Sequence, residues 1–465
     1  MNFGNISIAV FIIAMTVFCF FGRARSKTFA EFALSKSTFS SFALVATVVA
    51  SFVGAGTIIG NSEKSYTYGI SYLLPFMLGF SVQLILIGVL FANRISKFYS
   101  ALSVGDLFKH SYGKNIQILV GIVALAYTVV VVISQTVALG KLVGMISPFT
   151  YEINVIISVG FIVAYCYFGG VRSVVVTDIL QFLVFVIAIP VIFIYSVYHL
   201  GGVDVFLEKI PPYYFNPSHY FSTLEIIIIF LSLLLGDALV PQMTQRLLMT
   251  KDGRQASKVM TISGFTILPI VLLGGSLGMI AYAYNTTLTP SESISYLLNQ
   301  VLPYELKILA ILGLISIVMS SIDTCMNTSS VLLVNDILSP SLTTKLTLKR
   351  EFQIARLVVV IVGLIAVFVA MRTTDIIAVL INAYKFWSPT VLVPLIGILV
   401  NVTLSRKQFY LCFLSGGMSV IIWEALEFQN YTTIDSLIPG ILANFIAFVL
   451  CYSYNKYKNV EHCAL

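Results

Sequence analysis

Charged residues are scarce in this 465-residue chain: Asp, Glu, Lys and Arg together make up 10% of it, whereas hydrophobic residues make up 58%. Soluble globular chains carry about 25% charged residues, so this composition excludes an ordinary soluble protein. Apolar runs of about 20 residues recur along the whole length, and a helix of that length crosses the ~30 Å hydrocarbon core of a bilayer. The sequence therefore predicts an all-α integral membrane protein whose surroundings are lipid, with no soluble domain between the runs and no nucleic-acid partner.

Cysteine and histidine are also few. The six cysteines form no CxxC pair. The four histidines, His110, His199, His219 and His462, all fall in predicted loops. Disulfide frameworks and thiolate metal sites need paired cysteines, and zinc-dependent proteases need histidines on a helix. We therefore expect no disulfide, no cysteine metal site and no His-based intramembrane enzyme.

The apolar pattern predicts thirteen helices. The first has no basic residue before it and Arg23, Arg25 and Lys27 after it, which is the reverse of a secretory signal, so we expect it to remain as a helix with the N-terminus outside. Alternate loops and their margins then contain most of the 27 Lys and Arg residues, Arg246 among them, which places these loops and the C-terminus in the cytoplasm of a cell carrying the chain in its plasma or inner membrane. The expected helices span about 6–22, 39–59, 68–92, 116–146, 152–168, 173–198, 221–247, 260–284, 306–336, 353–371, 376–400, 408–426 and 436–454.

Two predicted helices contain residues that interrupt helices. The segment ATVVASFVGAGTIIG puts Gly54 and Gly56 in mid-membrane, where each glycine costs about 1 kcal/mol relative to alanine. Small residues that let two helices approach closely are an alternative reading of that segment. The segment LSLLLGDALVPQMTQR brings Gly236, Asp237 and Pro241 into another apolar helix, and proline there removes a backbone hydrogen bond and clashes with the preceding turn. We expect both helices to be broken.

The spacing of these two breaks predicts an internal repeat. Broken helices at corresponding positions of two five-helix halves are typical of secondary transporters with a LeuT-like 5+5 inverted repeat, here with core helices 1 and 6 broken. The freed carbonyls of such helices bind cations, and the half-helix N-termini face anionic groups of the solute. The expected divisions are an extra helix and loop at 1–38, the first repeat at 39–198, the second repeat at 199–400, and two further helices with a tail at 401–465.

Polar residues gather in the predicted helix 306–336. The sequence ISIVMSSIDTCMNTSS places Ser320, Asp323, Thr324 and Asn327 within eight positions of an otherwise apolar span. An isolated hydroxyl in such a helix usually bonds to the carbonyl four residues earlier. Several polar side chains on one face of the helix are better explained by a ligand that this face binds. Hydroxyl, carbonyl and carboxylate oxygens suit a hard cation such as Na⁺. Asp178, in the apolar run GGVRSVVVTDILQF, is a candidate for the charge, although a hydrogen bond to a neighbouring helix is the alternative.

Five stretches resemble the sodium:solute symporter family, whose members carry proline, pantothenate, sialic acid, sugars or choline. The resemblance covers nearly the whole chain, and its most specific element is the Gly-Gly followed by Thr-Asp-x-x-Gln in FGGVRSVVVTDILQF. The supporting stretches are ASFVGAGTIIG, PQMTQR, SSIDTCMNTSS and AYKFWSPTVLVPLIG.

The resemblance implies a binding site for one or two Na⁺ ions. Carried over residue by residue, the main site consists of carbonyls and hydroxyls from Ala50, Val53, Ile317, Ser320 and Ser321. A second site, present in some members, corresponds to Asp178, Ser321 and Thr324.

Two carboxylates depart from the family pattern. Asp323 stands where a small residue is usual, and it either adds negative charge near the ions or carries a proton. Asp237 follows Gly236 where the spacing to Pro241 is stretched. A carboxylate there favours a cationic or amino-bearing solute, and an ion pair with Lys385 is the alternative.

We expect a sodium-coupled symporter that imports a small organic solute by alternating access, the solute being an amino acid, choline, pantothenate, a sugar or a carboxylate. The alternatives are a proton-coupled carrier of the same fold, a channel, and an intramembrane aspartyl protease, whose signature has a glycine where Leu234 stands. From the register of the helices, the expected solute contacts are Gly54, Thr57, Phe76, Leu234, Asp237, Gln242 and Asn382.

Overall fold

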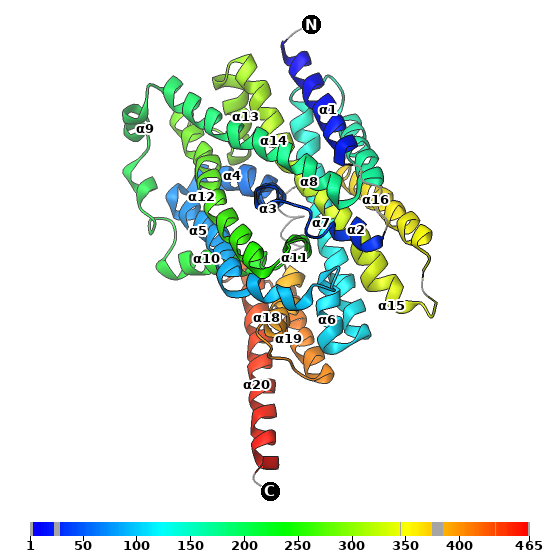
Figure 1. Ribbon diagram of the computed structural model, residues 1–465. Coiled ribbons are helices and arrows are strands. Elements are labelled where there is room, and N and C mark those ends of the chain that lie inside the picture. The colour runs from blue at the N-terminus through cyan, green and yellow to red at the C-terminus, as the bar shows by residue number, and fades with distance from the viewer. Residues whose placement is uncertain (1–2, 23–27, 345, 374–384, 433, 464–465) are drawn as a thin grey trace.

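The protein is a bundle of packed helices in the computed structural model, which describes residues 3–22, 28–344, 346–373, 385–432 and 434–463 (Figure 1). The described residues contain no strand, so the expected all-α class is confirmed. The two ends of the chain lie at opposite ends of the molecule, and the C-terminal helix α20 extends beyond the other helices (Figure 1).

Most predicted helices have a counterpart in the structure, with bounds that differ by a few residues. The part of the predicted helix 376–400 that lies among the described residues is Lys385–Leu399. The helices are α1 (Phe3–Gly22), α2 (Phe29–Leu34), α3 (Ser41–Phe52), α4 (Asn61–Tyr68), α5 (Ile70–Leu86), α6 (Val104–Tyr112), α7 (Lys114–Gly144), α8 (Tyr151–Leu200), α9 (Val203–Lys209), α10 (Thr223–Gly236), α11 (Pro241–Leu248), α12 (Gly253–Tyr284), α13 (Ser293–Tyr296), α14 (Tyr304–Val331), α15 (Ser339–Ser341), α16 (Leu348–Ala370), α18 (Val393–Leu399), α19 (Arg406–Ala425) and α20 (Leu437–Cys463).

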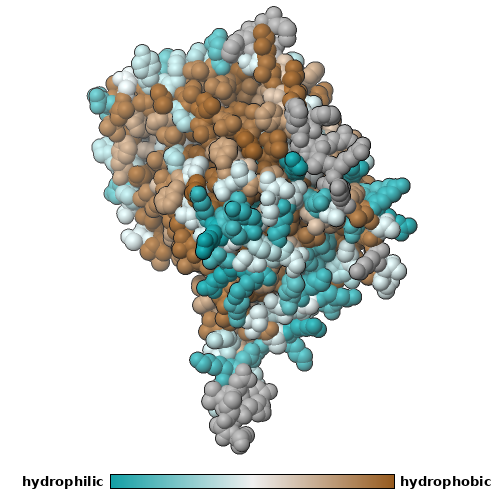
Figure 2. Space-filling view, in the orientation of Figure 1, coloured by the Kyte–Doolittle hydropathy of each residue, from teal (hydrophilic) through white to brown (hydrophobic). Residues whose placement is uncertain are grey.

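The outer surface suits contact with lipid. Among the described residues, seven helices are long and apolar enough to cross a membrane, and two further pairs of bent helices pass the same test as single spans. Large hydrophobic side chains are exposed on the outer faces of α1, α8, α16 and α20. Figure 2 shows hydrophobic side chains over most of the upper part of one face and hydrophilic ones gathered below them. These features fit a multi-pass membrane protein, while the total of thirteen spans remains a prediction.

The helix α8 joins two segments that the sequence predicts as separate helices, 152–168 and 173–198. Its 50 residues contain one non-helical position, Gly170, with φ 61° and ψ −169°. This conformation is accessible almost only to glycine. A Cβ atom there would also lie 2.7 Å from a ring carbon of Phe32 in α2. The helix therefore changes direction at Gly170 without a loop.

Both predicted helix breaks are present. The pair formed by α3 and the helix Gly56–Tyr68 bends by 63°, and the pair formed by α10 and α11 bends by 53°. Ser40 caps α3 by accepting a hydrogen bond from the Ala43 amide, and Val53, in an extended conformation, ends it. Pro241 occupies the first turn of α11, where its missing N–H removes no helical hydrogen bond.

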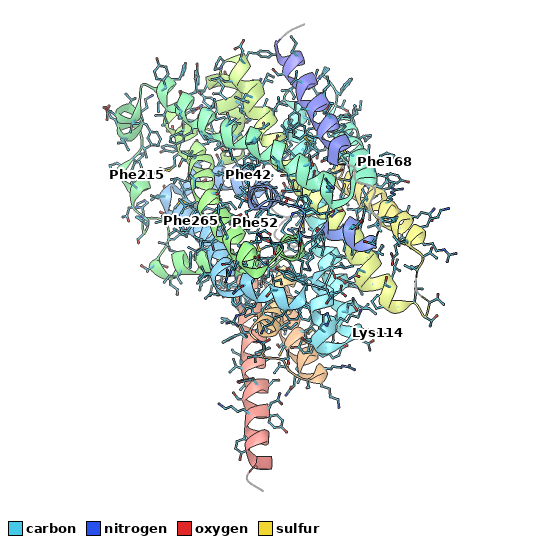
Figure 3. The ribbon with its side chains drawn as sticks, in the orientation of Figure 1. Phe42, Phe52, Lys114, Phe168, Phe215 and Phe265 are labelled. Carbon is cyan, nitrogen blue, oxygen red and sulfur yellow. The ribbon has the colours of Figure 1, made fainter. Side chains whose placement is uncertain are left out.

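The helix α14 lies at the centre of the bundle, packed against α3, α7, α8, α11 and α16. Nearly all its residues from Ala310 to Val331 are buried. Phe52, the last residue of α3, lies near the middle of the molecule (Figure 3). The broken helix α3 and the helix α11 that follows the second break therefore pack against α14 deep inside the protein.

Candidate functional site

The break after α3 is closed by a side chain from α7. The Ala55 amide donates to Gln135 Oε1 at 3.0 Å, and the Gly54 amide donates to Thr57 Oγ1 at 3.3 Å. A Cβ atom on Gly54 would lie 2.9 Å from Gln135 Nε2. Glycine at position 54 therefore lets α7 approach the backbone closely enough to satisfy an amide that the break leaves without a helical partner.

The break between α10 and α11 frees carbonyls that other side chains bind. Ser388 Oγ donates to the carbonyl oxygens of Leu235 at 2.8 Å and Gly236 at 2.7 Å. Trp387 Nε1 donates to the Ala238 carbonyl at 3.3 Å. Buried carbonyls without a partner are costly, so these bonds from the helix Lys385–Leu399 stabilise the unwound segment.

The residues expected at the main sodium site converge where α3 ends. Ser320 Oγ donates to the Ala50 carbonyl at 2.7 Å and to the Ile317 carbonyl at 2.9 Å, and Ser321 Oγ donates to the Ile317 carbonyl at 3.3 Å. Val53 is the residue at which α3 stops. The side chains of Ser320 and Ser321 are buried. This set of uncharged oxygens from two helices fits a hard monovalent cation such as Na⁺ better than a transition metal, which prefers nitrogen and sulfur.

The residues expected at the second sodium site surround an arginine. Arg246 Nη2 lies 3.4 Å from Asp178 Oδ2 and donates to Thr324 Oγ1 at 2.7 Å. The Thr47 hydroxyl also donates to Asp178, and the hydroxyls of Ser51 and Thr324 are 2.9 Å apart. Asp178 and Arg246 have 0% and 1% of their side-chain surface exposed, respectively. The positive charge that faces Asp178 is therefore a guanidinium group supplied by α11.

This position of Arg246 corrects the sequence analysis, which counted it among the margins of the cytoplasmic loops. Arg246 lies in the last turn of α11, but its side chain is buried and points toward α8 and α14. A signal was present: Gln242, Gln245 and Arg246 recur at helical spacing inside a broken helix, and Gln245 also bonds inside the protein, to the Thr328 hydroxyl at 2.7 Å.

Asp323 is turned toward α8. Its Oδ2 accepts a hydrogen bond from the Tyr165 hydroxyl at 2.7 Å and lies 3.5 Å from the Thr177 hydroxyl. Its Oδ1 has no hydrogen-bond partner in the part of the chain that the structure describes. Ser321, which was expected to share an ion with Asp178, lines the central cavity.

A cavity of about 490 Å³ lies between the two breaks. Aromatic side chains form one wall, where the ring centroids of Phe52 and Phe80 are 5.0 Å apart and those of Phe76 and Phe80 are 5.1 Å apart. Asp237 also faces this cavity and accepts a hydrogen bond from the Tyr127 hydroxyl at 2.6 Å. The structure brings five of the seven expected solute contacts around the cavity, namely Gly54, Thr57, Phe76, Asp237 and Gln242.

The other two expected contacts do not join this group. Leu234 does not line the cavity, because Ser232, Leu233 and Gly236 occupy the inward face of α10 at helical spacing. The Leu234 carbonyl instead accepts a hydrogen bond from Gln83 on α5 at 2.9 Å. Asn382 lies outside the described residues.

Lys385, which the sequence offered as a partner for Asp237, pairs with other carboxylates. Its Nζ lies 2.7 Å from Glu424 Oε1 on α19 and 4.0 Å from Asp435 Oδ2. Lys385 and Asp435 both line the cavity. The cavity is therefore bordered by one carboxylate at the α10 break and by an ion-paired group that joins the helix Lys385–Leu399 to α19.

Residues 32–404 match the family model of the sodium:solute symporter family. The chain belongs to the sodium:solute symporter family. The transporter is 25% identical over 396 residues to the sodium/pantothenate symporter of Haemophilus influenzae, covering 81% of this chain and 80% of the relative. It is also 25% identical over 378 residues to sodium/proline symporter 2 of Staphylococcus saprophyticus, covering 77% of this chain and 73% of the relative. These relatives are transporters, so the family is one of carriers and not of enzymes.

The fold of the transporter is shared with solved symporters. A Na⁺-coupled sialic acid symporter in a substrate-bound outward-open state matches with a TM-score of 0.84 at 15% identity, covering 98% of both chains. The crystal structure of MhsT in complex with L-phenylalanine matches with a TM-score of 0.60 at 11% identity, covering 90% of this chain and 99% of that chain. At these identities the likeness concerns the fold, which is LeuT-like.

Proposed function

We propose that this sodium-coupled transporter imports a small organic solute by symport with Na⁺, and that the ion binds at Ala50, Val53, Ile317, Ser320 and Ser321. The observation that carries the proposal is the Ser320 hydroxyl, which bonds to carbonyls of both α3 and α14 where α3 ends. An ion at this point joins the broken helix to α14 beside the cavity. Sodium binding thereby organises the wall of the solute site, and a coupling of about 1–3 kcal/mol tightens solute binding by about 5- to 150-fold.

We infer that one Na⁺ ion, not two, accompanies each solute. The second expected position requires a cation beside Asp178 and Thr324, and Arg246 supplies one there at 3.4 and 2.7 Å. A sodium ion added to the same oxygens would be repelled by the guanidinium group in a region without solvent.

Thermal unfolding of the purified protein in NaCl and in KCl tests the sodium site. A ligand that binds only the folded state at 100 times its Kd adds about 2.7 kcal/mol of stability. We expect Na⁺ to raise the melting temperature of the wild-type protein, and Ser320→Ala to remove most of that increase. Ser316→Ala is the matched control, because Ser316 is buried one turn earlier on α14 and bonds only to the Leu312 carbonyl of its own helix.

Uptake into proteoliposomes separates this proposal from its alternatives. A symporter accumulates solute against its gradient when Na⁺ is present outside, with saturation in both solute and Na⁺. Accumulation driven equally well in KCl by a proton gradient supports a proton-coupled carrier of the same fold. Flux that does not saturate and never exceeds equilibration supports a channel. A normal sodium response in Ser320→Ala would refute the location of the ion.

A further inference from the structure

The chemical environment of Asp237 points to the class of solute. This residue ends α10 and faces the cavity. The C-terminal end of a helix carries a partial negative charge, which adds to the charge of the carboxylate. A cation is therefore favoured in the part of the cavity beside the α10 break.

A second acceptor lies in the same wall. Gln242, in the first turn of α11, lines the cavity and is buried, yet its Oε1 has no hydrogen-bond partner among the described residues. A buried carbonyl-type oxygen without a donor is unfavourable, so a donor from a bound solute would satisfy it. Asp237 and Gln242 lie on the two sides of one helix break, which places both acceptors at one end of the cavity.

Another part of the cavity lining is aromatic and apolar. Phe76 and Phe80 stack at 5.1 Å between ring centroids, and Phe52 lies 5.0 Å from Phe80. Faces of aromatic rings attract cations and also bury apolar surface. Among the described residues, two cationic side chains line the cavity, Lys64 and Lys385, and Lys385 pairs with Glu424 and Asp435. The cavity thus combines one anionic acceptor, Asp237, and one neutral acceptor, Gln242, with aromatic rings in its lining.

We propose that the solute bears a protonated amine, that Asp237 and Gln242 Oε1 accept hydrogen bonds from its N–H groups, and that Phe52, Phe76 and Phe80 pack against its apolar body. This inference rests on the proposed sodium-coupled import. Asp237 is a specificity-determining residue in this arrangement, because it selects amines over isosteric solutes without a positive charge. A quaternary ammonium group, which lacks N–H donors, satisfies the charge of Asp237 but leaves Gln242 Oε1 without a partner.

The experiment is a thermal-shift screen of the full-length protein in NaCl. The solutes form matched sets: L-proline, pyrrolidine and cyclopentanecarboxylate; L-phenylalanine, phenethylamine and 3-phenylpropionate; and choline, pantothenate and glucose. We expect solutes with a protonated N–H group to raise the melting temperature and their amine-free partners to have no effect. Asp237→Asn should weaken binding of the stabilising amine at least about thirtyfold, the usual effect of removing one partner of a desolvated charge pair.

Asp204→Asn is the control, because Asp204 is an exposed carboxylate of α9 that is not among the residues lining the cavity. This variant should bind the amine like the wild type. Stabilisation by amine-free solutes alone, by none of the amines, or equally in wild type and Asp237→Asn overturns the proposal. The response to Na⁺ without solute is read in the same samples, so a failure of sodium coupling is distinguished from a failure of amine recognition.

Discussion

Replacement of Arg246 by methionine tests whether its charge compensates Asp178. The two groups are buried and 3.4 Å apart, so their attraction is about 5 kcal/mol at an effective dielectric constant of about 20. Removal of one partner of a buried ion pair typically costs about 3–5 kcal/mol, because the other charge remains buried. Methionine has a similar length and no charge. We therefore expect Arg246→Met to unfold at a markedly lower temperature than the wild type in KCl.

Sodium gives this variant a distinctive response. Without the guanidinium group, the Asp178 carboxylate and the hydroxyls of Thr47, Ser51 and Thr324 form a set of oxygens suited to Na⁺. We expect NaCl to stabilise Arg246→Met more than it stabilises the wild type.

The assay is the melting temperature of the purified protein across a titration of NaCl at constant ionic strength, and the control is the double variant Arg246→Met with Asp178→Asn. Replacing both members of a buried pair by uncharged groups is often neutral, so the double variant should recover most of the lost stability and should lose the extra sodium response. If Arg246→Met melts like the wild type in KCl, or if the double variant is less stable than the single one, the charge compensation is refuted.

Three further substitutions and one control variant test the backbone geometry by the same melting assay. Gly170→Ala should cost about 1–3 kcal/mol, because φ 61° with ψ −169° suits glycine alone, and an unchanged melting temperature would mean that α8 is straight there. Gly278→Ala should cost about 1–3 kcal/mol, because the new Cβ would overlap the α4 backbone, whereas Gly160→Ala, with nothing within 4 Å, should be neutral or stabilising. Gln135→Ala should cost about 1–3 kcal/mol by leaving the Ala55 amide unpaired, and equal stability would show that another group binds that amide.

The helix breaks and the polar stripe of α14 were predictable because local chemistry determines them. Glycines in mid-membrane and a proline after Asp237 weaken a helix, and both predicted breaks are present, although Pro75, Pro190 and Pro269 lie inside continuous helices. The stripe that includes Ser320 follows from helical periodicity, and the structure brings Ser320 and Ala50 into contact. Whether Na⁺ binds there remains a prediction.

The role of Arg246 was not predictable by the same reasoning. Counting basic residues at helix ends treats each as solvated. The helical spacing of Gln242, Gln245 and Arg246 indicates a polar helix face, but it does not identify the partner of Arg246, a carboxylate 68 residues away. The expected position of Leu234 at the cavity was wrong. The rotation of α10 about its axis is set by packing against α5, and a single sequence does not specify that packing. Local sequence patterns predicted the helices and their breaks. The long-range contacts decide which faces of these helices pack against one another.

The pairing of Asp178 with Arg246 also determines where the membrane voltage acts. An elementary charge that crosses 100 mV changes its energy by about 2.3 kcal/mol. The carboxylate of α8 and the guanidinium of α11 form a neutral unit, so their joint movement carries no net charge through the field. The pair therefore adds no voltage-dependent step of its own. Because the fixed charges of the protein return to their starting positions in each cycle, the net electrical work falls on the transported species. One Na⁺ with a zwitterion moves one charge per turnover, and one Na⁺ with a simple amine moves two, so the current measured per solute molecule reports the charge of the solute itself.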